Sequence, residues 1–240
     1  MNLLHVLFLI LIGLGAGFVQ RVSGFGLGIF FMVFMPHFLP AQAAAAISCI
    51  HSSITSTYNA IRYRKHVAYR TALPMLCAAL VTIPIAVSFA KRVSVDNFKL
   101  LLGIVLILFS LYFLFFYKHI RMKPGLRSGI LAGFLGGALN GLFSTGGPPV
   151  VLYLSSAMPE KIAYFATIQF YFCFTNLYAT AMRMVNGMLG GNVLLYAAVG
   201  AVGCLAGDFL GRIVFDKLDG DKLRRIIYIG MIISGVMMLF

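Results

Sequence analysis

The sequence predicts an all-α polytopic membrane protein, and three observations lead to that fold class. Of the 240 residues, 61% are hydrophobic and 10% are charged, and the mean hydropathy is +0.96. A soluble domain is about 45–50% apolar and about 25% charged. The charges fall between long neutral runs, and a glycine-rich stretch recurs along the chain. We therefore expect a single transmembrane domain, residues 1–240, made of the internal repeats 1–120 and 121–240.

The apolar runs divide into segments of helical length, because a membrane-spanning helix needs about 20 apolar residues, with a range of about 17–25. The first run reads as a retained helix rather than a cleaved signal, since it lacks a basic leading region. The segments 25–39 and 148–158 are short, which leaves their spanning open and gives about 8–10 crossings. In order, the predicted segments are 2–21, 25–39, 41–61, 70–90, 98–117, 126–144, 148–158, 161–183, 192–213 and 223–240.

The distribution of basic residues predicts how the two repeats are oriented. Five segments per repeat, an odd number, invert the second copy relative to the first. If the loop 62–70 is cytoplasmic, this topology places 14 basic residues on the cytoplasmic side and four outside, as the positive-inside rule requires. The inside groups are 62–70, 118–127, Lys161 and 212–225, and the outside residues are Lys91, Arg92, Lys99 and Arg183.

The net charge of +13 comes from 19 Lys and Arg against 6 Asp and Glu. In a membrane chain such an excess orients the loops and attracts anionic lipids, so we expect lipid headgroups rather than nucleic acid as partners. The four cysteines lie in apolar runs without a CxxC pair, which predicts small core residues and no metal, disulfide framework or cofactor.

The recurring stretch is Gly17 to Gly26, which aligns without a gap on Gly137 to Gly146. A duplication of one unit explains this alignment. The offset of 120 pairs Gly17 with Gly137, Gln20 with Asn140, Gly26 with Gly146 and Tyr58 with Tyr178.

The residues 23–28 and 144–149 are predicted helix breaks followed by helix starts. Ser and Thr favour the N-cap, glycine permits positive φ, and proline fits the first helical turn. A helix that begins inside the membrane directs free N–H groups and its positive dipole end at the interior, which is an anion site. Two such ends converge in an inverted repeat, as in secondary transporters. The alternative is that the glycines serve only close helix packing.

We identify ten candidate substrate-binding residues at these breaks. Gln20 and Asn140 either donate to a ligand or satisfy the broken backbone. Arg21 either pairs with an oxyanion or extends its stem to the interface. The candidates are Gln20, Arg21, Ser23, Gly24, Gly26, Asn140, Ser144, Thr145, Gly146 and Gly147.

Segment 41–61 carries more hydroxyl groups than a lipid-facing helix tolerates. Ser48, Ser52, Thr55 and Asn59 share one face by their three- and four-residue spacing, although each hydroxyl could instead bond to its own helix. The predicted cavity-lining residues are Ser48, His51, Ser52, Thr55, Asn59, Gln169 and Asn176.

The roles of two ionisable residues in apolar runs can each be interpreted in two ways. His51 is either a site for a coupling proton or a satisfied buried histidine. Asp208 lies four residues before Arg212, which favours an i,i+4 ion pair over a proton relay.

At the breaks the sequence resembles the sulfite exporter TauE/SafE family, also called the 4-toluene sulfonate uptake permease family. That family carries a glycine-rich signature close to G-x-x-x-G-x-x-G-x-G-G in each half. Residues 137–148 match it well, and residues 17–28 match more loosely, because Arg21 replaces a small residue and Leu27 interrupts the glycine pair. The resemblance implies transport of small sulfur-containing or organic anions, such as sulfite or sulfonates, across the cytoplasmic membrane.

Residues and resemblance together predict a secondary transporter, not an enzyme, that is a multi-pass protein of the cytoplasmic (inner) membrane. It is expected to work by alternating access, with one repeat rocking against the other. No GxxxxGK[ST] motif is present, so an ion gradient, with a proton or sodium ion as coupling ion, would drive uphill transport. The alternatives are an intramembrane serine hydrolase using Ser144 or Ser23 with His51, and a passive anion channel. The sequence specifies no oligomeric state.

Overall fold

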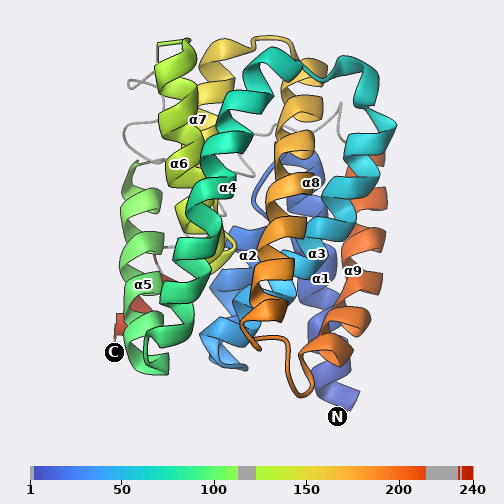
Figure 1. Cartoon of the computed structure of the whole chain (residues 1–240). Helices are drawn as coiled ribbons and strands as arrows, with labels where there is room; N and C mark the ends of the chain where they lie inside the picture. The colour runs from blue at the N-terminus through green and yellow to red at the C-terminus, as the bar shows by residue number, and fades with distance from the viewer. Residues whose placement is uncertain (1–2, 113–122, 215–231, 233, 240) are drawn as a thin grey trace.

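The computed structural model describes residues 3–112, 123–214, 232 and 234–239, and these residues form helices and short connections without a strand (Figure 1). The first half contains α1 (Leu3–Ser23), α2 (Leu27–Phe34), the 3-10 turn η1 (Met35–His37), α3 (Ala41–Arg62), η2 (Arg64–His66), α4 (Tyr69–Arg92) and α5 (Val95–Leu111). The second half contains α6 (Leu126–Phe143), α7 (Gly147–Ala157), α8 (Lys161–Val185) and α9 (Val193–Val214).

The helices follow the predicted segments to within about three residues at the described ends, because charged and glycine-rich stretches separate the apolar runs. The exception is α2, which ends at Phe34, well before the predicted end at residue 39, and the 3-10 turn η1 continues the segment to His37. The predicted end at residue 117 and most of segment 223–240 lie outside the described residues.

Four of the described helices are long and apolar enough to cross a membrane: α1, α4, α6 and α9. Helices α3, with 22 residues, and α8, with 25, are as long, but polar side chains interrupt their apolar sequence. Helices α2 and α7 have 8 and 11 residues. At about 1.5 Å per residue neither covers the ~30 Å hydrocarbon core. Length and composition alone therefore give fewer spans than the sequence predicts.

The closest helix pairs join the two halves of the chain. Helix α1 lies along α9, and a Cβ atom on Gly17 would overlap the Cys204 carbonyl. Helix α6 lies along α4, and a Cβ on Gly137 would stand 2.6 Å from Cα of Ala79. Small residues let backbones approach in this way inside a membrane bundle. These glycines of the repeated stretch therefore serve packing.

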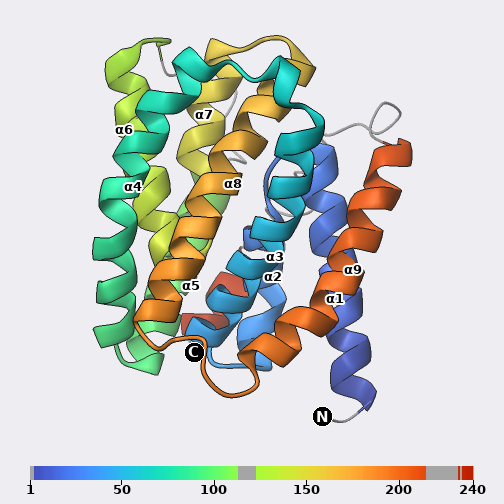
Figure 2. The ribbon, with the colours of Figure 1, turned by 45° about the vertical axis from the view of Figure 1, so that its right-hand side comes forward.

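The remaining contacts assemble two groups of helices (Figure 2). In what we call the first bundle, α2 and α3 join α1 and α9; in the second bundle, α7 and α8 join α4 and α6. Helices α3 and α8 pack against each other where the bundles meet. Each half thus contributes its first three helices to one bundle and its fourth helix to the other.

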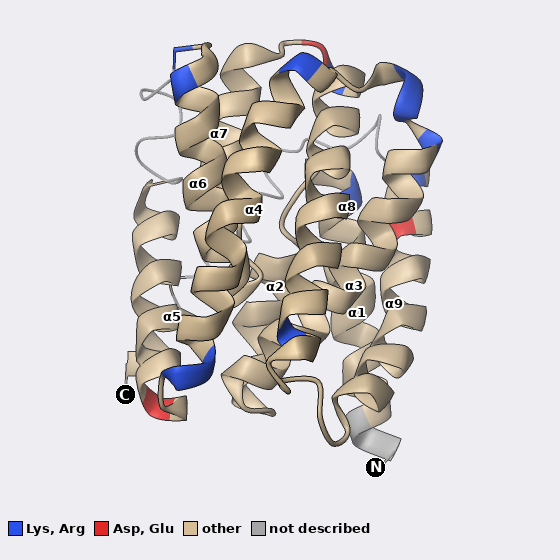
Figure 3. Ribbon diagram, in the orientation of Figure 1, with Lys and Arg blue, Asp and Glu red and all other residues tan. Residues whose placement is uncertain are grey.

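Most of the described charges lie toward the two ends of the molecule, and a few lie on the helices between them (Figure 3). Most basic residues lie at the end where α3 leads into α4 and where α6 begins, and fewer lie where α4 leads into α5. This distribution matches the predicted loop bias for the described residues except Arg183, which was predicted to be an outside charge but is buried in α8. The predicted basic residues Lys118, Arg121, Lys217, Lys222, Arg224 and Arg225 lie outside the described residues.

Candidate functional site

The two predicted breaks meet where the bundles meet. The first separates α1 from α2, and the second separates α6 from α7. A Cβ atom on Gly28 would overlap the Ser144 carbonyl, and one on Gly147 would stand 2.9 Å from the Phe25 side chain. Each break therefore approaches the other at a glycine, and at Gly28 the contact is with backbone and leaves no room for a Cβ atom. Elements about 120 residues apart in sequence form one site.

The helix starts at the breaks are capped by glycine, and the predicted Ser and Thr caps are wrong. The N-cap of α2 is Gly26, with φ of 102°, and the N-cap of α7 is Gly146; neither start has a side-chain cap. Positive φ suits glycine because it has no Cβ atom. Ser23 instead donates to the Val19 carbonyl at 2.7 Å. Two prolines occupy the first turn of α7, as predicted.

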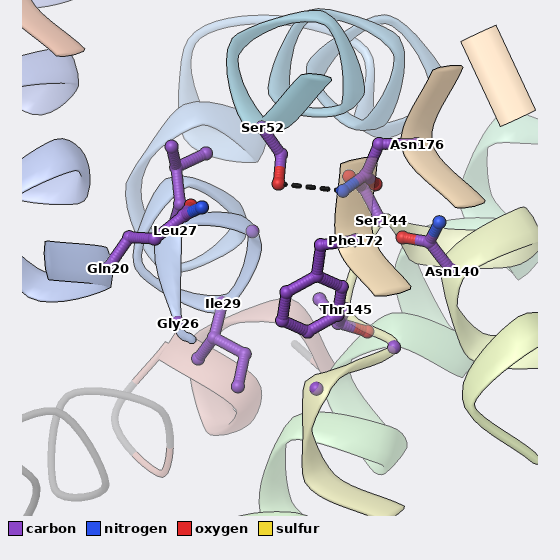
Figure 4. A pocket seen from close by; sticks show the side chains of 13 residues that line it. Gln20, Gly26, Leu27, Ile29, Ser52, Asn140, Ser144, Thr145, Phe172 and Asn176 are labelled. Carbon is purple, nitrogen blue, oxygen red and sulfur yellow. Dashed lines mark hydrogen bonds between the residues drawn. The ribbon is translucent and has the colours of Figure 1, made fainter. Parts of the chain in front are cut away.

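A small cavity of about 20 Å³ lies between the breaks (Figure 4). This volume holds about one water molecule. Seven of the ten predicted substrate-binding residues line it; Arg21, Ser23 and Gly24 do not. The lining consists of Gln20, Gly26, Leu27, Gly28, Ile29, Ser52, Asn140, Ser144, Thr145, Gly146, Gly147, Phe172 and Asn176.

The first break supplies backbone donors to this cavity. The first N–H groups of a helix have no acceptor within the helix. In α2 these belong to Leu27, Gly28 and Ile29, which all line the cavity. In α7, Pro148 and Pro149 have no N–H to offer. The second break must therefore contribute chiefly through its side chains.

Three side chains of the second break carry unused polar atoms. Nδ2 of Asn140, Oγ of Ser144 and Oγ1 of Thr145 are buried and have no hydrogen-bond partner among the described residues. Their residues are 1%, 5% and 2% exposed. A buried polar group left unsatisfied costs about 1–3 kcal/mol. These three groups, opposite the positive end of α2, form an arrangement that suits a small anion.

Gln20 and Gln169 lie near the first break and have different roles: one lines the cavity and the other satisfies the interrupted backbone. Gln169 donates through Nε2 to the Gly24 carbonyl at 2.8 Å, so it satisfies the interrupted backbone. Gln20 donates through Nε2 to Oε1 of Gln169 at 3.2 Å and to Oγ of Ser56 at 2.9 Å. Gln20 itself lines the cavity, as Asn140 does from the other break.

Only part of the predicted polar face of α3 reaches the cavity. Ser52 lines it and accepts a 2.9 Å hydrogen bond from Nδ2 of Asn176, which also lines it (Figure 4). Thr55 donates to the His51 carbonyl of its own helix at 3.1 Å. Five residues predicted to line the cavity lie outside its lining: Ser48, His51, Thr55, Asn59 and Gln169.

Arg21 is buried next to Gln20, which lines the cavity. It is 2% exposed, donates through Nη1 to Oδ1 of Asn59 at 2.7 Å, and lies over the Phe165 ring at 4.8 Å. Asn59 donates in turn to Oδ1 of Asp208 at 2.9 Å. Asp208 also pairs with Arg212 at 3.6 Å, which confirms the predicted i,i+4 pair. This polar cluster connects α1, α3 and α9.

His51 is held by backbone and aromatic contacts. Its Nε2 lies 2.8 Å from the Ala197 carbonyl, and the Phe31 ring meets it edge-on. The described hydrogen bonds of Ser23 involve its own segment, and Ser144 Oγ has none. The structure therefore does not assemble the serine–histidine pair that a hydrolase would need.

Arg183 is a buried residue beside the site that was not predicted from the sequence. Predicted to be an outside charge, it is in fact 1% exposed in the last turn of α8. Its Nη2 donates to the carbonyls of Asn140 at 3.1 Å and Gly141 at 2.9 Å, at the end of α6. Two features of the sequence point to it. The apolar run continues beyond Arg183, and the repeat offset that aligns Gln20 with Asn140 also aligns Tyr63 with Arg183.

No cluster of three or more potential metal ligands occurs in the part of the chain that the structure describes. The four cysteines are free thiols. Three are buried as predicted, whereas Cys77 is exposed, because it lies on the outer face of α4.

Comparison with known proteins assigns the chain to a family. The family model described as sulfite exporter TauE/SafE matches residues 9–238. No curated protein and no solved structure matches the chain. The matched family is one of membrane transporters of sulfite- and sulfonate-type anions and not of enzymes. This match covers nearly the whole chain, both breaks and the cavity between them, and the protein therefore belongs to the sulfite exporter TauE/SafE family.

Proposed function

We propose that this chain is a secondary transporter that binds a small sulfur-containing or organic anion, such as sulfite or a sulfonate, between its two helix breaks. The observation that carries the proposal is the convergence of unused donors on one cavity. Asn140, Ser144 and Thr145 face it from the second break, and the first turn of α2 faces it from the first. Anionic oxygens form stronger hydrogen bonds with such donors than neutral acceptors do.

The same proposal includes an inverted repeat. Its support is that equivalent helices make equivalent contacts. Helix α6 is the counterpart of α1, and α4 is the counterpart of α9; α1 packs on α9, and α6 packs on α4. The third helices α3 and α8 pack on each other, as an approximate two-fold axis between them requires. In this arrangement α2 and α7 are re-entrant helices that begin at the breaks inside the membrane.

Alternating access then requires the two bundles to move against each other, rather than one sequence repeat against the other. Separating the repeats would break the close α1–α9 and α4–α6 contacts, where glycines bring backbones together. Rocking about the α3–α8 interface preserves both pairs and opens the cavity to one side at a time. The cavity of about 20 Å³ corresponds to a closed form that widens around the anion.

We further propose that the protein lies in the cytoplasmic membrane with its basic end in the cytoplasm. Most of the described Lys and Arg residues lie at that end (Figure 3). There they follow the positive-inside rule and contact anionic lipids. A proton or sodium gradient supplies the driving force.

Counterflow in proteoliposomes tests the function. Vesicles preloaded with unlabelled sulfite should accumulate external labelled sulfite, and the initial rate should saturate with concentration, because each cycle carries a bound anion. Empty vesicles with the same protein serve as the control. Flux that rises linearly and needs no internal sulfite would assign the protein to the passive channels instead.

A further inference from the structure

Arg183 is a buried cation without a carboxylate partner. It is 1% exposed, and no Asp or Glu among the described residues forms an ion pair with it. Its Nη1 has no hydrogen-bond partner in the same part of the chain. An isolated buried charge is strongly unfavourable, and in membranes such residues mark ligand or ion pathways. The guanidinium therefore requires a compensating negative charge.

The end of α6 supplies part of that compensation. Nη2 of Arg183 donates to the carbonyls of Asn140, Gly141 and Leu142, the last at 3.5 Å. These carbonyls form the negative pole of the α6 dipole. The same pole faces the cavity, because Asn140 and Ser144 line it. Without a cation there, α6 would repel the anion that α2 attracts.

The first half also places a cation where its first helix ends, but there the first helix itself supplies the arginine. The offset of 120 relates Arg21 to Gly141 and Tyr63 to Arg183. Arg21, in the last turn of α1, donates to the hydroxyl of Tyr63, the residue that follows α3. Arg183, in the last turn of α8, donates to the Gly141 carbonyl of α6. Each half thus holds one guanidinium where its first helix ends, although the residue that supplies it differs.

We infer that Arg183 sets the charge preference of the anion site, as a positioning residue that acts through the end of α6 without touching the anion. It neutralises the negative pole and adds positive potential, so the site favours divalent over monovalent oxyanions. This inference rests on the proposed anion site and specifies which anions it prefers.

The test compares sulfate with methanesulfonate in titrations of the purified full-length protein by isothermal calorimetry. Arg183→Gln keeps an amide donor for the α6 carbonyls but removes the charge. Coulomb energy scales with ligand charge, so a loss of about tenfold for methanesulfonate implies about 100-fold for sulfate. Arg183→Lys should retain the native ratio of the two Kd values. Arg92→Gln, which removes an exposed cation at the end of α4, is the matched charge control and should change neither Kd.

Cys49→Asp provides a second variant that leaves Arg183 in place. Cys49 lies close enough to Arg183 for electrostatic interaction, so an aspartate there would compensate the guanidinium and keep its carbonyl bonds. It should weaken sulfate binding more than methanesulfonate binding, even if Arg183→Gln does not fold. Equal weakening of both anions in the folded variants would overturn the inference and leave Arg183 as a brace for α6. Failure of the native protein to bind either anion would instead overturn the proposed anion site.

Discussion

Three polar atoms of the second break are available to a ligand, and each belongs to a residue that the sequence singles out. Asn140 lies in the last turn of α6, and Ser144 and Thr145 lie in the short connection to α7. Ser144 also adopts a left-handed backbone, with φ of 59°, the only described non-glycine residue with positive φ. Such a conformation costs roughly 1–2 kcal/mol and marks sites where function constrains the chain.

Thr145→Val tests the use of one hydroxyl. The substitution preserves shape and removes a donor, and a hydrogen bond to a charged group contributes about 1.5–3 kcal/mol. We therefore expect the Kd for sulfite to rise about tenfold or more, measured by calorimetry. Because Oγ1 of Thr145 has no partner among the described residues, the melting temperature without anion should not fall.

Thr175→Val is the matched control for that variant. Thr175 is equally buried, but its Oγ1 donates to the Tyr171 carbonyl at 2.9 Å and lies outside the cavity lining. Sulfite affinity should stay unchanged in this protein. Equal losses of affinity in both variants would show that Thr145 acts through general packing.

Residue-scale prediction from the sequence succeeded where local pattern determines the outcome. The glycine-rich repeat located seven of the cavity-lining residues, because helix breaks require unusual backbone that only certain residues adopt. It failed for Arg183 and for the helix caps. Whether a charge near a helix end faces solvent or a neighbouring helix depends on tertiary packing, which one segment does not encode.

At the scale of elements, glycines divide between two tasks. Gly28 and Gly147 let the breaks approach each other, whereas Gly17 and Gly137 let helices of different halves touch. The two readings of these glycines, site and packing, therefore both apply, at different positions. Helix boundaries followed from hydropathy, but helix partners did not, because contacts between halves leave no local periodic signal.

Gly17→Ala should destabilise the α1–α9 pair. The new Cβ would overlap the Cys204 carbonyl, a backbone atom that cannot rotate away, so the helices must separate at a cost of about 1–3 kcal/mol. Thermal unfolding in detergent measures the loss. Gly190→Ala, where no atom lies within 4 Å, is the matched control and should melt like the native protein. Identical melting of the two variants would contradict backbone contact between α1 and α9.

At the scale of the whole molecule, α3 and α8 form the interface about which we propose that the bundles move. One side-chain contact across this interface is suited to cross-linking: Oγ1 of Thr180 on α8 lies 3.4 Å from the Sγ of Cys49 on α3. This contact crosses between the bundles beside the cavity residue Asn176, whose carbonyl also contacts Cys49.

Oxidation of Thr180→Cys should therefore lock the transporter. A disulfide with Cys49 would join the bundles, so sulfite counterflow should stop on oxidation and return on reduction. The same variant with Cys49→Ala cannot form the bridge, and its counterflow should not respond to oxidant. Full activity of the quantitatively cross-linked protein would show that motion occurs elsewhere.

An anion that scatters anomalously can show whether a small anion binds between the two breaks. Crystals of the protein with ordinary methionine, grown with the tetrahedral oxyanion selenate, would reveal the selenium of selenate in an anomalous difference map. We expect one peak in the cavity, with an anion oxygen about 2.7–3.2 Å from Nδ2 of Asn140 and Oγ1 of Thr145. A selenium peak only outside the cavity, with Asn140, Ser144 and Thr145 unchanged around it, would contradict the account.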